Sequence, residues 1–258
     1  TKYITFGSTQ EINLEARAVT FDRTDKYLSA GNVNDLANTN YTISAWIKKD
    51  IGTGKFDIVS KRNYFNKNND SETNTDIEAT YSHGYAFEIN RTNQFRMVWR
   101  DPEDATNNSI ETSEKIPENE WHQIAVTYNS ATNMTRLYID GHEENSDDSL
   151  NPMQTPSDAH FMIGAAHYIK RQQKYGGSVD EVRVWDVALT GNQIRYIMNQ
   201  EIEKNNILGT DYVDGKILPI NTTKNEIISM PWDNLIAYYP MNTLVFGSIK
   251  DESNSGND

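Results

Sequence analysis

The chain has 258 residues, which is long enough for one large all-β domain or two small ones. Its 24 Lys and Arg against 37 Asp and Glu give a formal net charge of −13, which argues against nucleic acid or an anionic membrane surface as the main partner. The absence of cysteine excludes disulfides, thiolate metal sites and a cysteine nucleophile. No run of about eighteen apolar residues occurs, so the sequence predicts no membrane span, and residues 1–16 lack the pattern of a secretory signal.

Alternation of apolar and polar residues with a period of two is the main local signal. In residues 41–48 ("YTISAWIK"), Tyr41, Ile43, Ala45 and Ile47 share one face, and we expect the other face to be wetter. Four later runs repeat this pattern, at residues 85–90, 95–100, 121–128 and 136–140. Many short strands with turns between them predict an antiparallel sandwich or jelly roll.

The chain after these strands predicts one helix. Thr190 is a suitable N-cap, and Ile194, Ile197, Met198 and Ile202 recur at helical spacing. We expect this helix to pack across the outside of the sandwich. Three polar insertions, at residues 62–83, 100–108 and 145–160, are too long for tight turns and are expected to be binding loops or mobile segments.

Five sequence blocks resemble, in order and spacing, a laminin-G-like domain of the concanavalin-A-like jelly-roll superfamily. The blocks read "AVTFDRTDKYLSAG", "YTISAWIK", "NEWHQIAVTYNSATNMTRLYIDG", "FMIGAA" and "YGGSVDEVRVWDVALTGNQI", and the resemblance covers roughly residues 18–202. The resemblance implies an all-β fold, an antiparallel β-sandwich (jelly roll, concanavalin-A-like) with one short outer helix. The layout is similar to that of secreted multidomain Bacteroidetes surface proteins, which implies a secreted or cell-surface location.

The domain organisation has two alternatives at its C-terminal end. We expect a laminin-G-like domain over residues 1–204, followed by a connector and strand over residues 205–258. The stretches "NLIAYYPMN" and "KDESNSGND" resemble the opening of a further laminin-G-like unit. Residues 235–241 therefore either complete the same sandwich as an edge strand or begin a neighbouring domain of a larger chain.

Asp180 and Glu181 are adjacent acids in a predicted strand, and the superfamily includes glycoside hydrolases. Such enzymes need two carboxylates on one ligand, whereas neighbours in a strand point to opposite faces. No Glu-x-Asp-x-(x)-Glu run and no HExxH spacing occur. We therefore expect a protein without catalytic activity, with Glu181 paired to Arg183 in an exposed setting. A glycoside hydrolase or polysaccharide lyase with an unrecognised site is the alternative.

Asp180 is a candidate metal ligand. Val182 and Val184 define the apolar face of its strand, and alternation places Asp180 on the same inward side. A carboxylate there needs a metal, an arginine or backbone amides as partner. The resemblance implies a structural calcium, held by the aspartate of "VDEVRV" together with Asp22 and Asp25 near the first strand. The alternative is an Asx-turn at Asp22 and Asp25, with Asp180 accepting backbone amides.

Carbohydrate sites combine aromatic rings with planar polar groups, because sugars offer both C–H faces and hydroxyls. The expected function is a carbohydrate-binding or adhesive module, and the alternative is a passive spacer in a tandem array. Residues 167–175 are basic within an acidic chain, which favours an acidic polysaccharide as partner. The candidate ligand-binding residues, for each of which core or loop packing is the alternative, are Tyr64, Tyr81, His83, Trp99, Arg100, His167, Tyr168, Arg171 and Tyr175.

Overall fold

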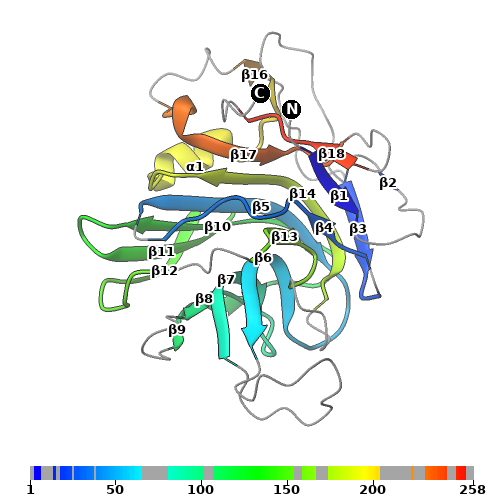
Figure 1. Cartoon of the computed structure of the whole chain (residues 1–258), viewed down its shortest axis with the longest axis horizontal. Helices are drawn as coiled ribbons and strands as arrows, with labels where there is room; N and C mark the ends of the chain where they lie inside the picture. The colour runs from blue at the N-terminus through cyan, green and yellow to red at the C-terminus, as the bar shows by residue number, and fades with distance from the viewer. Residues whose placement is uncertain are drawn as a thin grey trace.

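Two antiparallel sheets packed face to face form the protein (Figure 1), which confirms the predicted β-sandwich with one short helix. The computed structural model describes residues 3–6, 14–15, 18–24, 26–37, 39–65, 81–100, 107–153, 159–166, 174–203, 222–223, 230–242 and 248–253.

Within the part of the chain that the structure describes, sheet A has eight strands. In spatial order they are β18 (Ser248–Lys250), β1 (Tyr3–Phe6), β4 (Leu28–Ser29), β13 (Met162–Ile163), β6 (Phe56–Phe65), β7 (Tyr81–Ile89), β8 (Gln94–Arg100) and β9 (Asn107–Lys115). The predicted insertion at residues 62–83 is therefore shorter than expected, because β6 and β7 extend into it from both sides.

Sheet B packs on the other side of the core. In spatial order its strands are β12 (His142–Asp147), β11 (Met134–Ile139), β10 (Trp121–Asn129), β5 (Tyr41–Lys49), β14 (Gly176–Trp185), β3 (Ala18–Asp22) and β2 (Leu14–Glu15), with β17 (Leu235–Tyr239) also paired to β14. A short parallel pair, β15 (Ile202–Glu203) and β16 (Thr222–Thr223), lies apart from both sheets.

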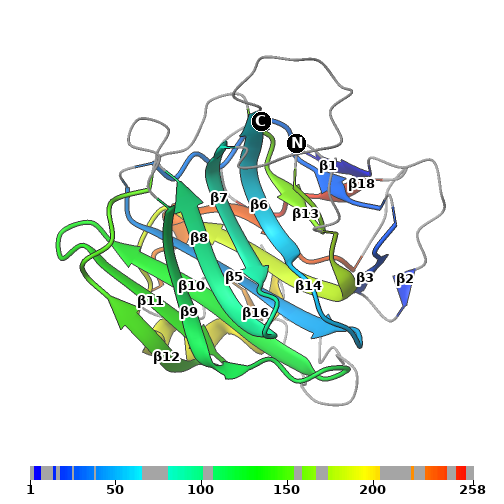
Figure 2. The ribbon, with the colours of Figure 1, turned by 90° about the horizontal axis from the view of Figure 1, so that it is seen from below.

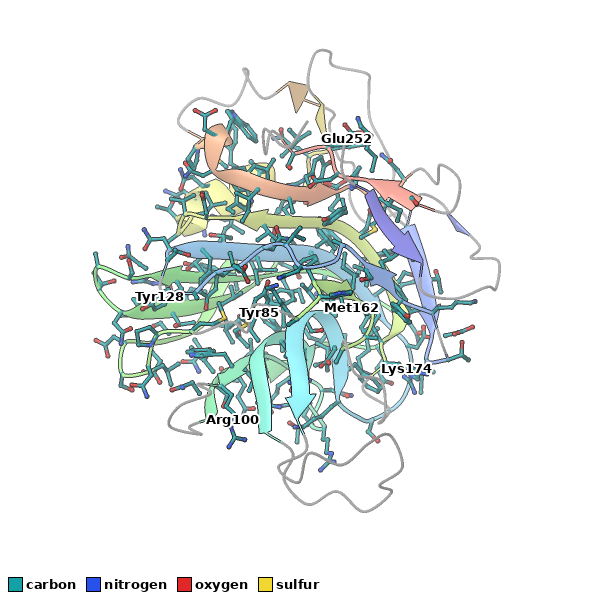
Figure 3. The ribbon with its side chains drawn as sticks, in the orientation of Figure 1. Tyr85, Arg100, Tyr128, Met162, Lys174 and Glu252 are labelled. Atoms are coloured by element: carbon teal, nitrogen blue, oxygen red, sulfur yellow. The ribbon has the colours of Figure 1, made fainter. Side chains whose placement is uncertain are left out.

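The core lies between the sheets and follows the predicted alternation. Phe95, Met97 and Trp99 of β8 all point into it and are buried. Tyr85 and Phe87 of β7 do the same, and Figure 3 shows Tyr85 in the middle of the sandwich. The rings of Phe87 and Phe95 meet edge to face, with centroids 4.6 Å apart.

The helix α1 (Gly191–Ile197) covers the outer face of sheet B. Thr190 caps it as predicted, in a capping box with Gln193. Ile194 and Ile197 pack against Trp185 of β14 in a second apolar cluster. Ile202, expected on the helix, lies beyond its end in β15.

The outer side of β5 is buried, so the expected wetter face is wrong. Thr42 and Trp46 are almost completely buried there. The Thr42 hydroxyl donates to the Val187 carbonyl at 2.7 Å, and the Trp46 indole donates to the Met198 carbonyl at 2.6 Å. The helical segment thus takes the place that water would have on this face.

The C-terminal strands complete both sheets. β17 pairs with β14 in sheet B, and β18 pairs with β1 in sheet A. The backbone of Glu252 donates to the Tyr238 carbonyl at 2.8 Å, and the Tyr238 N–H donates to Asp251 at 2.9 Å. Leu235–Tyr239 is therefore a strand of this sandwich, while the division of the chain into domains stays a prediction.

A β-bulge interrupts β14 at the two adjacent acids. Asp180 lies opposite Trp46, but the next aligned residue is Arg183, and Glu181 has a φ of +51°. Val179 and Val182 consequently both point into the core. The extra residue turns both acids toward the outer side of sheet B, so the prediction that they face opposite sides is wrong.

Glu181 and Arg183 form the expected ion pair, but the pair is buried rather than exposed. The Tyr238 hydroxyl also donates to Glu181, at 3.0 and 3.1 Å to its two oxygens. Arg183 donates to the carbonyls of Ile197, at 2.8 Å, and of Gln200, and its guanidinium lies 5.1 Å from the centre of the Tyr238 ring. This network joins β14, the end of α1 and β17.

We predict that Asp180→Asn changes the pH dependence of stability. Burial, followed by the charges of Glu181 and Glu201, raises the pKa of Asp180 well above its usual value near 3.8. The unfolded chain therefore releases this proton first, and the free energy of unfolding falls as the pH rises above about 4, by up to about 1.4 kcal/mol per pH unit. The variant should lack this component in urea titrations between pH 4 and 7. Parallel pH profiles for the two proteins would contradict the prediction.

We predict that Gly177→Ala destabilises the fold far more than Gly31→Ala. Both glycines have positive φ, of +133° and +75°. A Cβ at Gly177 would lie 2.1 Å from the Lys48 carbonyl oxygen, whereas one at Gly31 meets nothing within 4 Å. We expect a loss of about 3 kcal/mol or more at Gly177 and about 1 kcal/mol at Gly31 in urea unfolding. Equal losses of stability in the two variants would mean that the positive φ alone, and not the contact with the Lys48 carbonyl, decides the effect.

Candidate functional site

The outer face of sheet A is the side turned away from sheet B, and Figure 2 shows its strands β6, β7, β8 and β9 side by side. Cross-strand register arranges its side chains in three rows. The rows are Arg62, Gly84 and Arg100; then Ser60, Ala86, Val98 and Ser109; then Asp57, Glu88, Arg96 and Glu111.

Small residues in these rows leave room for a long side chain. Ser60, Gly84 and Ala86 surround the place where Arg62 crosses from the first row to the third. The Arg62 Nη2 donates to Asp57 Oδ1 at 2.6 Å and to Glu88 Oε2 at 3.1 Å. One nitrogen of the guanidinium is therefore shared by two carboxylates from neighbouring strands.

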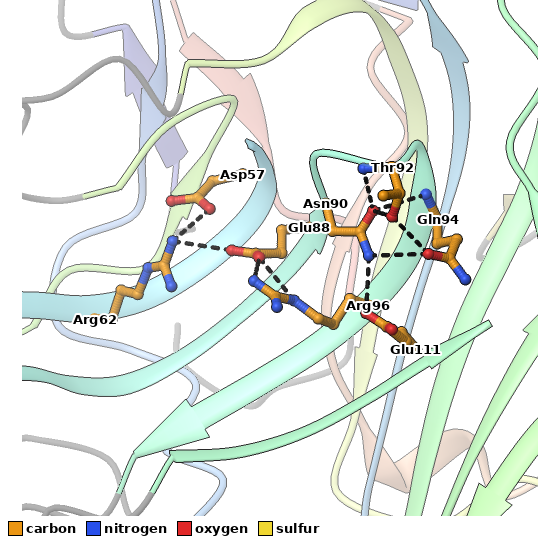
Figure 4. A network of polar contacts seen from close by, with 8 residues as sticks. All are labelled: Asp57, Arg62, Glu88, Asn90, Thr92, Gln94, Arg96 and Glu111. Carbon is orange, nitrogen blue, oxygen red and sulfur yellow. Dashed lines mark hydrogen bonds and ion pairs between the residues drawn. The ribbon is translucent and has the colours of Figure 1, made fainter. Parts of the chain in front are cut away.

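Glu88 links two guanidiniums (Figure 4). Its Oε2 accepts from Arg62, and its Oε1 accepts from Arg96 through Nε at 2.9 Å and through Nη2. Asp57 and Glu88 have no exposed surface. Burying such charges costs several kcal/mol each unless they are paired and hydrogen-bonded, so the arrangement depends on all four side chains.

The two carboxyls differ in acidity. Burial raises the pKa of Asp57 to about 7, although the charge of Arg62 opposes the change. Burial acts the same way on Glu88, but Arg62 and Arg96 outweigh it and hold the pKa of Glu88 below its usual value. Lys55, just before β6, has its pKa lowered by burial and lies within range of the charge on Glu88.

A second polar cluster fixes the tip of the β7–β8 hairpin. Asn90 Oδ1 accepts from the Thr92 backbone at 2.9 Å and from the Gln94 backbone at 3.0 Å. Asn90 Nδ2 donates to Glu111 at 2.8 Å (Figure 4). Glu111 is thereby tied to the hairpin although it lies on β9.

Accessibility changes across this face. Arg62, which lies over β6 and β7, is buried. Arg96 and Arg100 on β8 are partly exposed, and Glu111 on β9 is exposed. Figure 3 shows Arg100 at the periphery of the molecule, away from the core. A ligand would therefore contact the β8–β9 side, backed by the buried charges.

Two of the expected ligand-binding residues are in the core. Trp99 points inward and donates from its indole to the Asn151 carbonyl at 2.9 Å. Tyr175 is fully buried, with its ring edge to face with Phe21 at 6.3 Å. The prediction of a binding role for Trp99 and Tyr175 is wrong, because neither ring offers a face to solvent.

Arg100 lies on the outer face of sheet A, beside the end of β7 where Tyr81 and His83 are placed. Tyr64 of β6 pairs with residue 82 at the same end of the sheet, whereas strand alternation places positions 81 and 83 on the face opposite to Gly84 and Arg100. The side chains of Tyr64, Tyr81 and His83 lie outside the described part of the structure. His167, Tyr168 and Arg171 lie outside the described residues altogether.

Asp22 and Asp180, two of the three residues proposed for calcium, are not brought together. Asp22 accepts from the Thr24 backbone at 3.1 Å and pairs with Lys26 at 2.9 Å, which is the Asx-turn alternative. Asp22 aligns with Gly176, four residues from Asp180 along β14, or about 13 Å. Within the described ranges, which omit Asp25, no group of three or more acidic or histidine side chains could hold a metal ion. Calcium stays a prediction.

Sequence reasoning missed the residues that form this face. Glu88 and Arg96 alternate with core residues of β7 and β8, which was a usable signal. Asp57 shares a face with Arg62 only because a bulge lies between Asp57 and Val59. What the sequence did not show was the register that places Glu88 between Asp57 and Arg96.

Comparison with known proteins gives one family and several distant folds. A laminin-G family model, described as the concanavalin A-like lectin/glucanases superfamily, matches residues 22–195. Among curated proteins, the rat sushi, von Willebrand factor type A, EGF and pentraxin domain-containing protein 1 is 27% identical in an alignment of 105 residues that covers 37% of this chain and 3% of that protein. The chain thus spans a small part of that relative.

Two solved structures share the fold at low identity. A protein described as carbohydrate-binding from Bacteroides ovatus is 17% identical, with a TM-score of 0.55, over 97% of this chain and 55% of that one. The CBM40 domain of the Ruminococcus gnavus IT-sialidase is 13% identical, with a TM-score of 0.52, over 70% of this chain and 95% of that one. With the two-sheet sandwich and the match over residues 22–195, the chain belongs to the concanavalin A-like lectin/glucanases superfamily.

Proposed function

We propose that this protein is a non-catalytic carbohydrate-binding module whose ligand lies on the outer face of sheet A. The observation that carries the proposal is the set of planar charged groups, Arg62, Glu88 and Arg96, that fix one another on a sheet surface. Groups held in place before binding lose little conformational entropy when a ligand arrives. The sialidase module of similar fold has been solved with α2,3 sialyllactose, which supports a glycan as the ligand class.

The charge of this face favours an acidic glycan. The described side chains on it and at its rim include four basic groups, Lys55, Arg62, Arg96 and Arg100, against the three acids Asp57, Glu88 and Glu111. The whole chain, by contrast, carries a formal charge of −13. A guanidinium matches a carboxylate or sulfate with two parallel hydrogen bonds, so Arg96 and Arg100 are suited to such groups.

The buried acids support binding rather than hydrolysis. Asp57 and Glu88 are cross-strand neighbours, as a pair of catalytic carboxylates could be. Both are fully buried and both accept a hydrogen bond from Arg62. A glycosidase needs its two carboxyls on either side of the scissile bond, and these two do not face an accessible space.

The wider context of the module is a secreted or cell-surface protein with an adhesive role. Within the described residues, no helix is long and apolar enough to cross a membrane. The curated relative is far longer than the stretch it shares with this chain. This context supports a module that works beside other domains. A structural calcium stays a prediction.

We predict that Arg100→Ala weakens binding of an acidic oligosaccharide at least about tenfold, because a charge-assisted hydrogen bond at a partly exposed site is lost. A glycan array that includes uronate and sulfated oligosaccharides identifies the ligand, and calorimetry with the best hit measures the affinity.

Arg136→Ala is the matched control. Arg136 is a partly exposed arginine of β11 in sheet B, paired with Glu143 at 3.4 Å. We expect its affinity to equal that of the unaltered protein. An array without any hit would favour the passive spacer, and equal losses in both variants would place the ligand elsewhere.

A further inference from the structure

Asp57 and Glu88 share one guanidinium on the outer face of sheet A. They are cross-strand partners on β6 and β7, and neither has exposed surface. Nη2 of Arg62 reaches both, at 2.6 Å to Asp57 and 3.1 Å to Glu88. Two buried carboxylates beside one another disfavour double ionisation, so one of them takes a proton more readily.

The hydrogen bonds show which carboxyl that is. Both oxygens of Glu88 accept from guanidiniums, Oε2 from Arg62 and Oε1 from Arg96. Asp57 uses Oδ1 only, and its Oδ2 is buried without a hydrogen-bond partner in the described part of the chain. An unsatisfied anionic oxygen is costly in a buried place, so the proton belongs on Asp57.

The charged groups around Asp57 come from several elements. Arg62 on β6 and Arg96 on β8 are basic, and Glu88 on β7 is acidic. Lys55 lies before β6, within range of Glu88, Arg62 and also Arg91 of the β7–β8 hairpin. Lys174, ahead of β14, forms a backbone bridge with Asp57. Burial outweighs the basic groups and holds the pKa of Asp57 at about 7.

We propose that Asp57 is a proton-dependent positioning residue, which acts through Arg62 to set the charge of the ligand face. This inference rests on the proposed function. When Asp57 carries a proton, Arg62 keeps Glu88 as its anionic partner and the face gains one positive charge. An acidic glycan therefore binds more tightly below neutral pH than above it.

The proton on Asp57 can be observed without any ligand. Infrared difference spectra between pH 5 and 9 should show a protonated-carboxyl band that disappears near pH 7 in the unaltered protein. Asp180 is a second buried carboxyl with a raised pKa, so the spectra are compared in an Asp180→Asn background. The loss should remain in that background and be absent once Asp57→Asn is added. Carbon-13 NMR of the Asp180→Asn protein labelled at the aspartate carboxyls gives the same titration if the double variant fails to fold. A band loss that persists after Asp57→Asn is added, or no aspartate titrating near neutrality in the Asp180→Asn protein, would overturn the inference.

Binding of an oligogalacturonate tests the consequence for the ligand, because its carboxylates stay ionised over this range. One additional charge near the site should tighten binding about three- to tenfold from pH 8.5 to pH 5.5. Asp57→Asn should bind at the tighter level at both pH values.

Glu111→Gln is the matched control, since it removes an acid from the same face without touching Asp57. It should bind more tightly at both pH values and keep the pH dependence. A pH profile retained in Asp57→Asn, or lost in Glu111→Gln, would overturn the role of Asp57.

The two proposals fail in different ways. If oligogalacturonate and the array glycans bind at no pH, the proposed function fails and the link to ligand binding falls with it, while the infrared titration still decides the protonation of Asp57. If a glycan binds with the same affinity at every pH, the function stands and the role of Asp57 is wrong.

Discussion

Strand β14 is buried on both faces along its whole length, and the outer architecture of the molecule depends on this burial. An antiparallel strand commonly has one face exposed to solvent, but the outward-pointing side chains of β14 are buried as well. Trp185 is covered by α1. Arg183 is enclosed because it pairs with Glu181, lies against the ring of Tyr238 and donates to carbonyls at the end of the helix. The helix, the turn after it and β17 are therefore all fixed to one strand.

Because α1 and the residues before β17 cover sheet B, the two outer faces of the sandwich differ in the side chains that they present. The outer face of sheet B is occupied by α1 and the segment that leads into β17, whose side chains form a separate apolar cluster with Trp185. The outer face of sheet A carries small residues, Ser60, Gly84 and Ala86, with arginines and carboxylates between them. This difference supports placing the proposed ligand on sheet A.

Ion pairs have different roles on the two faces. Glu181 and Arg183 are enclosed, and their hydrogen bonds end on backbone carbonyls and on Tyr238, so they fix how elements meet. Glu88 also joins two guanidiniums, but Arg96 is partly exposed. A buried ion pair is weak support for stability, and on sheet A its clearer effect is to hold the Arg96 guanidinium in place for the proposed ligand.

The sequence by itself determined the features that depend on neighbours along the chain. Alternation gave the inward faces of β7 and β8, and it already put Trp99 beside Phe95 and Met97, where a role in the core should have been preferred. The cap at Thr190 and the sequence blocks of the superfamily are equally local.

Only the tertiary structure decided the strand register and which segments cover the outer face of sheet B. The bulge at Glu181 occurs where the partner of β14 changes from β3 to β17, two strands more than two hundred residues apart along the chain. Glu88 meets Asp57 and Arg96 because three strands align, and Trp46 is buried because the segment after α1 crosses it. Such contacts depend on which distant segments pair, and the period of a single strand carries no information about that choice.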